Sequence, residues 1–169
     1  MDSTLGGNLA DRVRRIIDDN AYMVLGTADD SGRPWTSPVF YAAHECRVFY
    51  WISSPDVTHS RNIADRPEIS IVIFDSRAPV GSGGERAVYM TATAVQVPSD
   101  DLDRALAVAP SFARHGEDDI TPAEVRPPSL DRLYRAMVTE HTVACPRSAG
   151  EPCADHRFNY DHRTPVRLA

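Results

Sequence analysis

The feature that most constrains the fold is a series of short apolar runs separated by short connections. The runs cover residues 21–28, 34–43, 47–53, 68–74 and 86–97. Strands that follow one another through short turns pair antiparallel, because parallel neighbours need a crossover of a dozen or more residues. We therefore expect a mainly β (α+β) fold with peripheral helices, in which an antiparallel sheet closes into a barrel.

Helical patterns lie between these runs. An apolar stripe at Leu9, Val13, Ile16 and Ile17 predicts a first helix, with Asn8 as its cap and an end at Asn20. The segment Ser54-Pro55-Asp56 predicts a second helix from Pro55 to about Asp65, capped by Ser54.

A third helical region is predicted inside residues 99–128. Ser99 is the expected cap of a helix with one apolar face, and Thr121-Pro122-Ala123-Glu124 has the pattern of a capping box. The apolar face consists of Leu102, Ala105, Leu106 and Ala109. Residues 132–144 and 163–168 are expected to supply the last strands, although the pattern of the former is also compatible with a helix.

Two of the predicted strands have unusual features. Pro38 lies inside the run 34–43, and proline cannot donate to a sheet ladder, so this strand is predicted to lie at an edge or to be broken there. The run 47–53 places large apolar side chains on both faces. Its outer face needs a second cover, for which a dimer partner is one candidate.

Length and charge limit the classes of function. The chain has 169 residues, which predicts one domain over residues 1–169 with its core at about 21–97, C-terminal strands at about 132–144 and 163–168, and a helical insertion at about 99–128. The net charge of −6 disfavours nucleic-acid partners. No apolar run reaches the roughly 20 residues that span a bilayer, and no signal peptide is recognised, so we expect a cytoplasmic protein without membrane partners.

The chain contains no lysine, and all 18 of its basic side chains are arginine. This excludes mechanisms that need a lysine amine, such as a Schiff base with pyridoxal phosphate or a phosphate-loop lysine. Any bound phosphate must therefore be held by arginine, histidine, hydroxyl groups or backbone N–H groups.

Two further patterns are not expected to form a binding site. The loop Gly81–Gly84 precedes a predicted strand and lacks dinucleotide-binding spacing, so it is read as a hairpin loop. The remaining candidates for metal ligands are cysteines and histidines near the C-terminus, namely Cys145, Cys153, His156, His141 and His162. Because the spacing C-x7-C-x2-H matches no common zinc pattern, we expect no metal site and no disulfide framework.

Residues 53–62 form the strongest candidate site. They lie where a strand ends and a helix begins, and the first turn of a helix offers unpaired N–H groups and the positive end of the helix dipole. Thr58, His59, Ser60 and Arg61 add donors to this turn, while Asp56 opposes an anion. The pattern predicts a phosphate site, with an ordinary capped surface helix as the alternative.

The order of these pieces resembles a known family. The motifs are G-R-P-W-T-S-P-V-F (residues 32–40), R-V-F-Y-W-I-S-S (47–54), H-S-R-N-I-A-D-R-P-E-I-S-I (59–71) and A-V-Y-M-T-A-T-A (87–94). In this order and spacing they are similar to the pyridoxamine 5'-phosphate oxidase-like flavin-binding split barrels.

The resemblance implies a homodimeric split β-barrel that holds flavin mononucleotide (FMN) across the dimer interface. The strand with the G-x-P motif would contact the flavin ring, which corresponds to Thr36, Ser37, Pro38 and Val39. A hydroxyl at the end of the next strand and a basic group in the following helix would hold the phosphate. These correspond to Ser53 and His59, with Ser60, Arg61 and Asn62 beside them.

His59 stands where the family usually has a phosphate-binding lysine, which implies weaker and pH-dependent flavin binding. The substrate-phosphate residues of pyridoxamine phosphate oxidases are not found, so we expect an FMN-dependent oxidoreductase of unknown small-molecule substrate, with catalytic residues unassigned. One alternative is a deazaflavin-dependent reductase, with Arg61, Arg66 or Arg163 lining a channel for the acidic tail. Another is a non-enzymatic cofactor-binding or haem-binding barrel with His59 or His44 as axial ligand.

Overall fold

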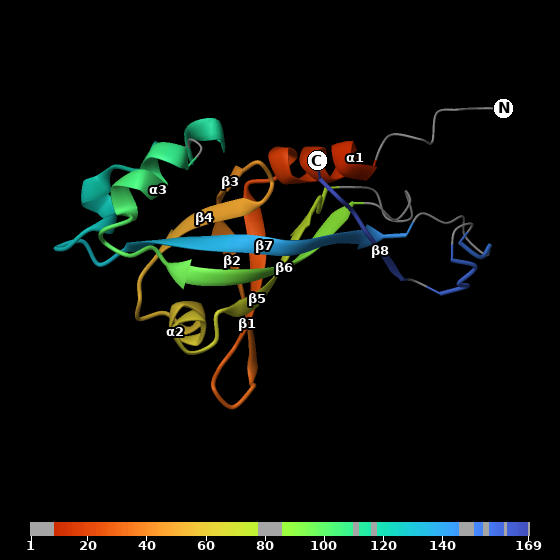
Figure 1. Ribbon diagram of the computed structural model, residues 1–169, viewed down its shortest axis with the longest axis horizontal. Helices are drawn as coiled ribbons and strands as arrows, with labels where there is room; N and C mark the ends of the chain where they lie inside the picture. Colours follow the sequence, from red (N-terminus) through yellow and green to blue (C-terminus); the bar gives the residue numbers. More distant parts are fainter. Residues whose placement is uncertain are drawn as a thin grey trace.

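The computed structural model describes residues 9–77, 86–109, 112–115, 118–145, 151–153, 156–160 and 162–168 (Figure 1). The elements are α1 (Leu9–Asp19), β1 (Tyr22–Ala28), β2 (Pro34–Phe40), β3 (Ala42–His44), β4 (Val48–Ser53), α2 (Thr58–Asp65), β5 (Glu68–Phe74), β6 (Ala87–Gln96), α3 (Leu102–Val108), the 3-10 helices η2 (Phe112–His115) and η3 (Pro122–Val125), β7 (Arg132–Ala144) and β8 (Arg163–Pro165). The predicted cap Asn8 and the loop Gly81–Gly84 lie outside the described residues.

All described strands belong to one antiparallel sheet. Their order is β2-β1-β5-β6-β7-β4-β3, and β8 pairs with β7. This confirms the mainly β architecture with peripheral helices. In the described part of the chain β2 pairs only with β1, so the prediction of an edge strand at Pro38 is confirmed. The predicted strand 34–43 is divided at Tyr41, a fully buried residue whose hydroxyl donates to the Ile17 carbonyl.

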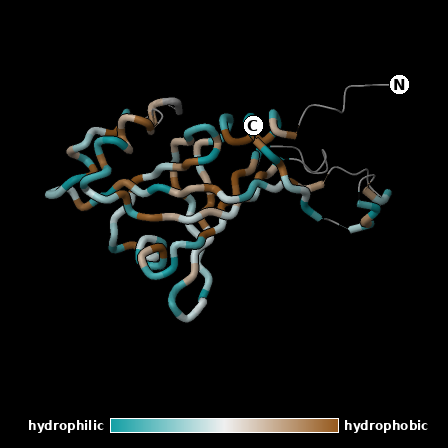
Figure 2. The backbone as a smooth tube through the Cα atoms, in the orientation of Figure 1, coloured by the Kyte–Doolittle hydropathy of each residue, from teal (hydrophilic) through white to brown (hydrophobic). Residues whose placement is uncertain are grey.

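The main core lies on the inner face of the curved sheet. Alternate residues of β1, β5 and β6 point inward, and α1 closes this face with Val13 and Ile17. Figure 2 shows the hydrophobic residues concentrated in the central strands, whereas the β1–β2 turn is hydrophilic. Each fully buried aliphatic side chain in this core contributes about 1.5–3 kcal/mol relative to exposure.

A second core covers the opposite face of β4. Tyr50 and Leu133 are buried there against Leu102 of α3 and Val125 of η3. The cover that the apolar pattern of residues 47–53 required is therefore supplied by the chain's own helical insertion. The dimer partner that was one candidate for this cover is therefore not needed on this face. The insertion packs against the outer face of the sheet, beside β4 and β7 (Figure 1).

Two helices begin later than predicted. α2 begins at Thr58, because Ser54 caps a separate turn by accepting the Asp56 N–H at 3.2 Å. α3 begins at Leu102 after Asp101 rather than directly after Ser99. In both cases the helix begins three or four residues after the predicted cap.

Other local predictions agree with the structure. The capping box is confirmed in η3, where the Thr121 N–H donates to Glu124 Oε2 at 2.7 Å. β7 is a strand, which settles the ambiguity between helix and strand for that segment. None of the helices in the described residues has the length and apolar character needed to cross a membrane.

The C-terminal segment contributes to the core. The predicted strand over residues 163–168 is shorter in the structure, because β8 ends at Pro165. Val166 and Leu168 turn inward and join the main core beside α1. Backbone bonds hold this segment, with the Val166 N–H donating to the His141 carbonyl at 2.8 Å and the Arg47 guanidinium donating to the Leu168 carbonyl.

Candidate functional site

His59 connects two strands that are far apart in the order of the sheet. It lies in the first turn of α2, and its side chain reaches β2 on one side and β4 on the other. Its Nδ1 lies 3.1 Å from Ser37 Oγ, and its Nε2 lies 2.9 Å from Ser53 Oγ. The structure thus brings together three residues whose motifs are separated in the sequence.

The environment of His59 favours its neutral form. Only 8% of the residue is exposed, and this burial lowers the pKa of the imidazole below its usual value. In a neutral imidazole one ring nitrogen donates a hydrogen bond and the other accepts one. Trp35 Nε1 also donates to Ser37 Oγ at 2.9 Å, so the Ser37 hydroxyl is positioned from two directions.

The first turn of α2 beside this cluster offers backbone donors. The first intrahelical bond runs from the Arg61 N–H to the Val57 carbonyl at 3.1 Å, which leaves the N–H groups of residues 58–60 without a carbonyl partner inside the helix. Arg61 is exposed, and its guanidinium donates to the Asp56 carbonyl. This turn therefore combines N–H groups that have no partner inside the helix with a positive charge.

Arg132 is a second cation near the same place that the sequence did not reveal. It is the register partner of Ser53 across β4 and β7, and its Nη1 donates to the Ser129 and Asp131 carbonyls at 2.7 and 2.6 Å. Only the pairing of two strands about eighty residues apart places it there, so the sequence contains no local signal for it.

The remaining predicted residues point in different directions. Val39 packs in the main core, Ser60 is buried, and Asn62 Nδ2 donates to Thr27 Oγ1 at 3.0 Å. The Asn62 bond joins α2 to β1, and Val39 anchors β2 in the main core. Thr36 and Pro38 are exposed on the outer face of β2. The nine predicted residues therefore lie on three elements, β2, β4 and α2, and hydrogen bonds join Ser37, Ser53 and His59 among them.

The arginines suggested for a deazaflavin tail do not line one channel. Arg66 Nη2 donates to the Asp30 carbonyl in the β1–β2 turn at 2.8 Å. The Arg163 guanidinium stacks on the Tyr89 ring, 3.6 Å from its centre, and Arg163 pairs with the far end of β7. Within one chain, Arg163 therefore lies at the end of β7 opposite to the partner of Ser53.

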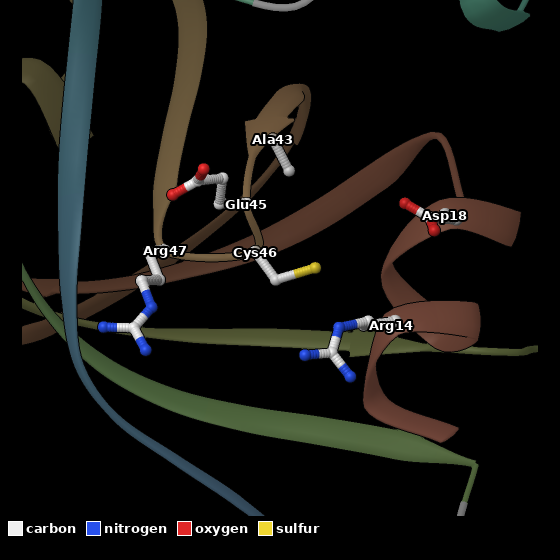
Figure 3. Close-up of a pocket in the computed structure, with 6 residues that line it drawn as sticks. All are labelled: Arg14, Asp18, Ala43, Glu45, Cys46 and Arg47. Carbon is white, nitrogen blue, oxygen red and sulfur yellow. The ribbon is translucent and has the colours of Figure 1, made fainter. Parts of the chain in front are cut away.

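A pocket of about 520 Å³ lies elsewhere, between α1 and the β3–β4 turn (Figure 3). Arg14 and Asp18 of α1 face Cys46 and Arg47 of the turn across it. None of the predicted cofactor-binding residues lines this pocket. Near this pocket, the Nε2 of His141 lies within hydrogen-bond distance of the Cys46 carbonyl, at 2.7 Å.

Comparison with known families identifies the class of the chain. Residues 9–144 match the family model described as Pyridoxamine 5'-phosphate oxidase. The match covers most of the chain, so the protein belongs to this family of split barrels. Comparison with curated proteins gives no match.

Solved structures share the fold at low sequence identity. A heme-binding protein from Mycobacterium smegmatis is 20% identical with a TM-score of 0.63, over 94% of this chain and 58% of that protein. A putative 5-nitroimidazole antibiotic resistance protein from Bacteroides thetaiotaomicron is 13% identical with a TM-score of 0.60, covering 78% and 80%. An F420 reductase is 18% identical with a TM-score of 0.50, covering 72% and 88%. The chain thus spans little more than half of the mycobacterial protein, and these likenesses concern the fold.

Proposed function

We propose that the chain is a homodimeric split barrel that binds FMN and acts as a flavin-dependent oxidoreductase on a small molecule. The observation that carries the proposal is the bridge from His59 to Ser37 and Ser53. It joins the strand that the family resemblance assigns to the flavin ring with the strand end that it assigns to the phosphate. Two segments that the resemblance assigns to different parts of FMN therefore meet in one hydrogen-bonded cluster.

The residues present fit a phosphorylated ligand. The open N–H groups at residues 58–60 and the Ser53 hydroxyl would donate to phosphate oxygens, while Arg61 and Arg132 supply positive charge nearby. His59 would act as a neutral donor and as a support for Ser53, in place of a charged lysine. With Nε2–H donating to Ser53, the Nδ1 of His59 would accept the Ser37 hydroxyl, so the backbone N–H groups on the free edge of β2 would donate to the polar edge of the ring. The bound flavin would supply hydride or electron transfer.

The outer face of the sheet supports the dimer in this proposal. Inward residues alternate with outward ones along β1 and β5, and the outward set includes large apolar side chains. The outward apolar residues are Tyr22, Val24, Pro38, Val72 and Phe74, and of these Tyr22 is 62% exposed. A contiguous apolar face of this kind is typical of a protein interface.

The functions of the structural relatives define the competing cofactors. Heme binding and F420 reduction both occur on this fold. In this chain both ring nitrogens of His59 already lie within hydrogen-bond distance of serines, so an axial bond to haem iron would require the loss of one contact. This observation favours flavin over haem as the ligand of this site.

The test is a binding comparison on the purified full-length chain. We expect FMN fluorescence to be quenched with one site per chain, and riboflavin, which lacks the phosphate, to bind at least about tenfold more weakly, the effect of losing roughly 1.4 kcal/mol. Parallel titrations use the deazaflavin coenzyme and haemin. Tighter binding of either, or no quenching by FMN, would overturn the proposal.

Matched variants locate the site. Ser53→Ala should weaken FMN binding more than it weakens riboflavin binding, because its hydroxyl is assigned to the phosphate. Ser76→Ala removes an exposed serine hydroxyl in the turn after β5 and should leave both affinities unchanged. Light scattering should give twice the chain mass. A monomer that binds FMN would contradict the dimer while leaving the flavin assignment standing.

A further inference from the structure

Four potential metal ligands converge at the end of β7. They are Cys145, Cys153, His156 and His162, and one ligand atom from each lies within 4.8 Å of all the others. Their spacing along the chain, C-x7-C-x2-H-x5-H, matches no common zinc pattern. We propose that these residues bind one Zn²⁺ in a closed Cys2His2 site that fastens the C-terminal segment to the sheet.

The distances agree with tetrahedral coordination. With Zn–S near 2.3 Å and Zn–N near 2.0–2.1 Å, ligand atoms around one zinc are separated by about 3.6 Å for sulfur and nitrogen and about 3.3 Å for two nitrogens. His156 Nδ1 lies 3.5 Å from each cysteine Sγ and 3.2 Å from His162 Nε2. The two Sγ atoms are 3.0 Å apart and need only to separate by about 0.8 Å to fit the same tetrahedron.

The backbone holds the ligands in place. The β7–β8 ladder pairs Ala144 with Arg163, and in the next step the Cys145 N–H donates to the His162 carbonyl at 2.8 Å. Two backbone bonds lie beside the other two ligands: the Cys153 N–H donates to the Phe158 carbonyl, and the Arg157 N–H donates to the Cys153 carbonyl. Arg157 adopts a positive φ of 59°, an uncommon conformation for a residue with a side chain.

Contacts around the cluster orient its histidines. The Nδ1 of His162 lies 3.0 Å from the Tyr160 carbonyl, and donation to that oxygen leaves Nε2 as the free ligand atom. The Phe158 ring stacks on His156 at an interplanar angle of 19° and meets His162 edge-on. Carbonyl support of a ligating imidazole is the usual arrangement around protein-bound zinc.

The donor set defines the metal and its role. Two thiolates and two imidazoles in a tetrahedron favour Zn²⁺, and four protein ligands leave no open position for substrate. Both cysteines are buried. Arg132 is the first residue of the 13-residue strand β7, and Cys145 directly follows its last residue. At the usual rise per residue the two lie roughly 40 Å apart. The inference is therefore independent of the proposed cofactor site.

The experiment measures metal and thiols in the full-length protein. After expression with zinc and purification without chelators, elemental analysis should give about one zinc per chain. Replacement by Co²⁺ should produce thiolate-to-cobalt charge transfer and the intense visible bands of tetrahedral coordination. Unfolding in a chelator without reductant should release three titratable thiols, one for each cysteine of the chain.

Variants separate this site from adventitious binding. Cys153→Ser and His162→Ala should each lower the zinc content to under about a tenth of an ion per chain. A chelator should lower the melting temperature of the unaltered protein but not that of these variants. Cys46→Ala, which changes the buried cysteine outside the cluster, should retain one zinc. If the ligand variants do not fold, the cobalt spectrum of the unaltered protein still decides. A metal-free protein that takes up neither zinc nor cobalt, or a single titratable thiol indicating a Cys145–Cys153 disulfide, would overturn the proposal.

Discussion

Among single residues, the two buried histidines His59 and His141 have the clearest consequences. Each has only 8% of its surface exposed, and burial lowers the pKa of each imidazole in the folded protein. His59 contacts two serine hydroxyls, whereas His141 contacts the Cys46 carbonyl. Both are therefore neutral groups held in place by neutral partners, and protonation of either disturbs its surroundings.

This arrangement predicts that the free energy of unfolding falls as the pH is lowered through the region below 6.5. There the unfolded chain binds protons that the folded chain does not, so stability is present above the unfolded pKa and decreases by up to about 1.4 kcal/mol per pH unit for each histidine. Urea unfolding at pH 7.5 and 5.5 measures the effect. The double variant His59→Gln/His141→Gln should lose less stability over this interval, and an equal loss would contradict the prediction.

Gly32 provides a second prediction for a single residue. It has a φ of +86° in the β1–β2 turn, and a Cβ there would meet no atom within 4 Å, so backbone strain is the only cost of a side chain. Gly32→Ala should destabilise the protein by about 1 kcal/mol. Gly32→Asn should cost less, because asparagine tolerates this conformation better. Thermal unfolding of both variants gives the comparison, and equal melting temperatures for both would argue against it.

The Asp29 side chain organises the same turn. Its Oδ1 accepts the Ser31 hydroxyl at 2.6 Å and the backbone N–H groups of Ser31 and Arg33. The Ser31 hydroxyl bond is the main reason that the pKa of this carboxyl is lowered. The Asp29 carboxylate is thus a structural support of that turn.

Among the elements, the helical insertion determines how β4 is buried. Leu102 of α3 is 4% exposed and packs in the second core with Tyr50. Leu102→Ala should therefore cost about 2–5 kcal/mol, the range for removing a buried leucine side chain. Val108→Ala, on the exposed side of the same helix, should change the stability by less than about 0.5 kcal/mol. Urea unfolding of both variants tests the assignment, and equal effects would refute it.

The element boundaries show which local signals were sufficient. Pro38 predicted an edge because a missing N–H affects the ladder wherever the strand lies. The capping box at Thr121 was recognisable because both partners are three residues apart. Ser54 and Ser99 both predicted helix starts that are too early, and at Ser54 the reason is that a serine side chain supports a turn as readily as a helix.

At the scale of the whole molecule, the end of the described chain seals the main core. Leu168 is 6% exposed and lies in the same core as Val13 and Ile17 of α1, which brings the two ends of the described chain together (Figure 1). Leu168→Ala should lower the free energy of unfolding by about 2–4 kcal/mol. The neighbouring Arg167→Ala changes an exposed residue and should have little effect. Similar unfolding midpoints for the two variants would show that this segment is not part of the core.

Patterns among near neighbours were enough to predict the antiparallel sheet, its edge at Pro38 and the helical insertion. Alternation, caps and proline act over a few residues, so the linear chain carries them completely. Three features depended on tertiary packing: the cover of Tyr50 by the insertion, the meeting of Ser37, Ser53 and His59, and the cluster around Cys145. Each joins segments through strand register or helix docking, and the distance between residues along a chain does not specify which distant surfaces will meet.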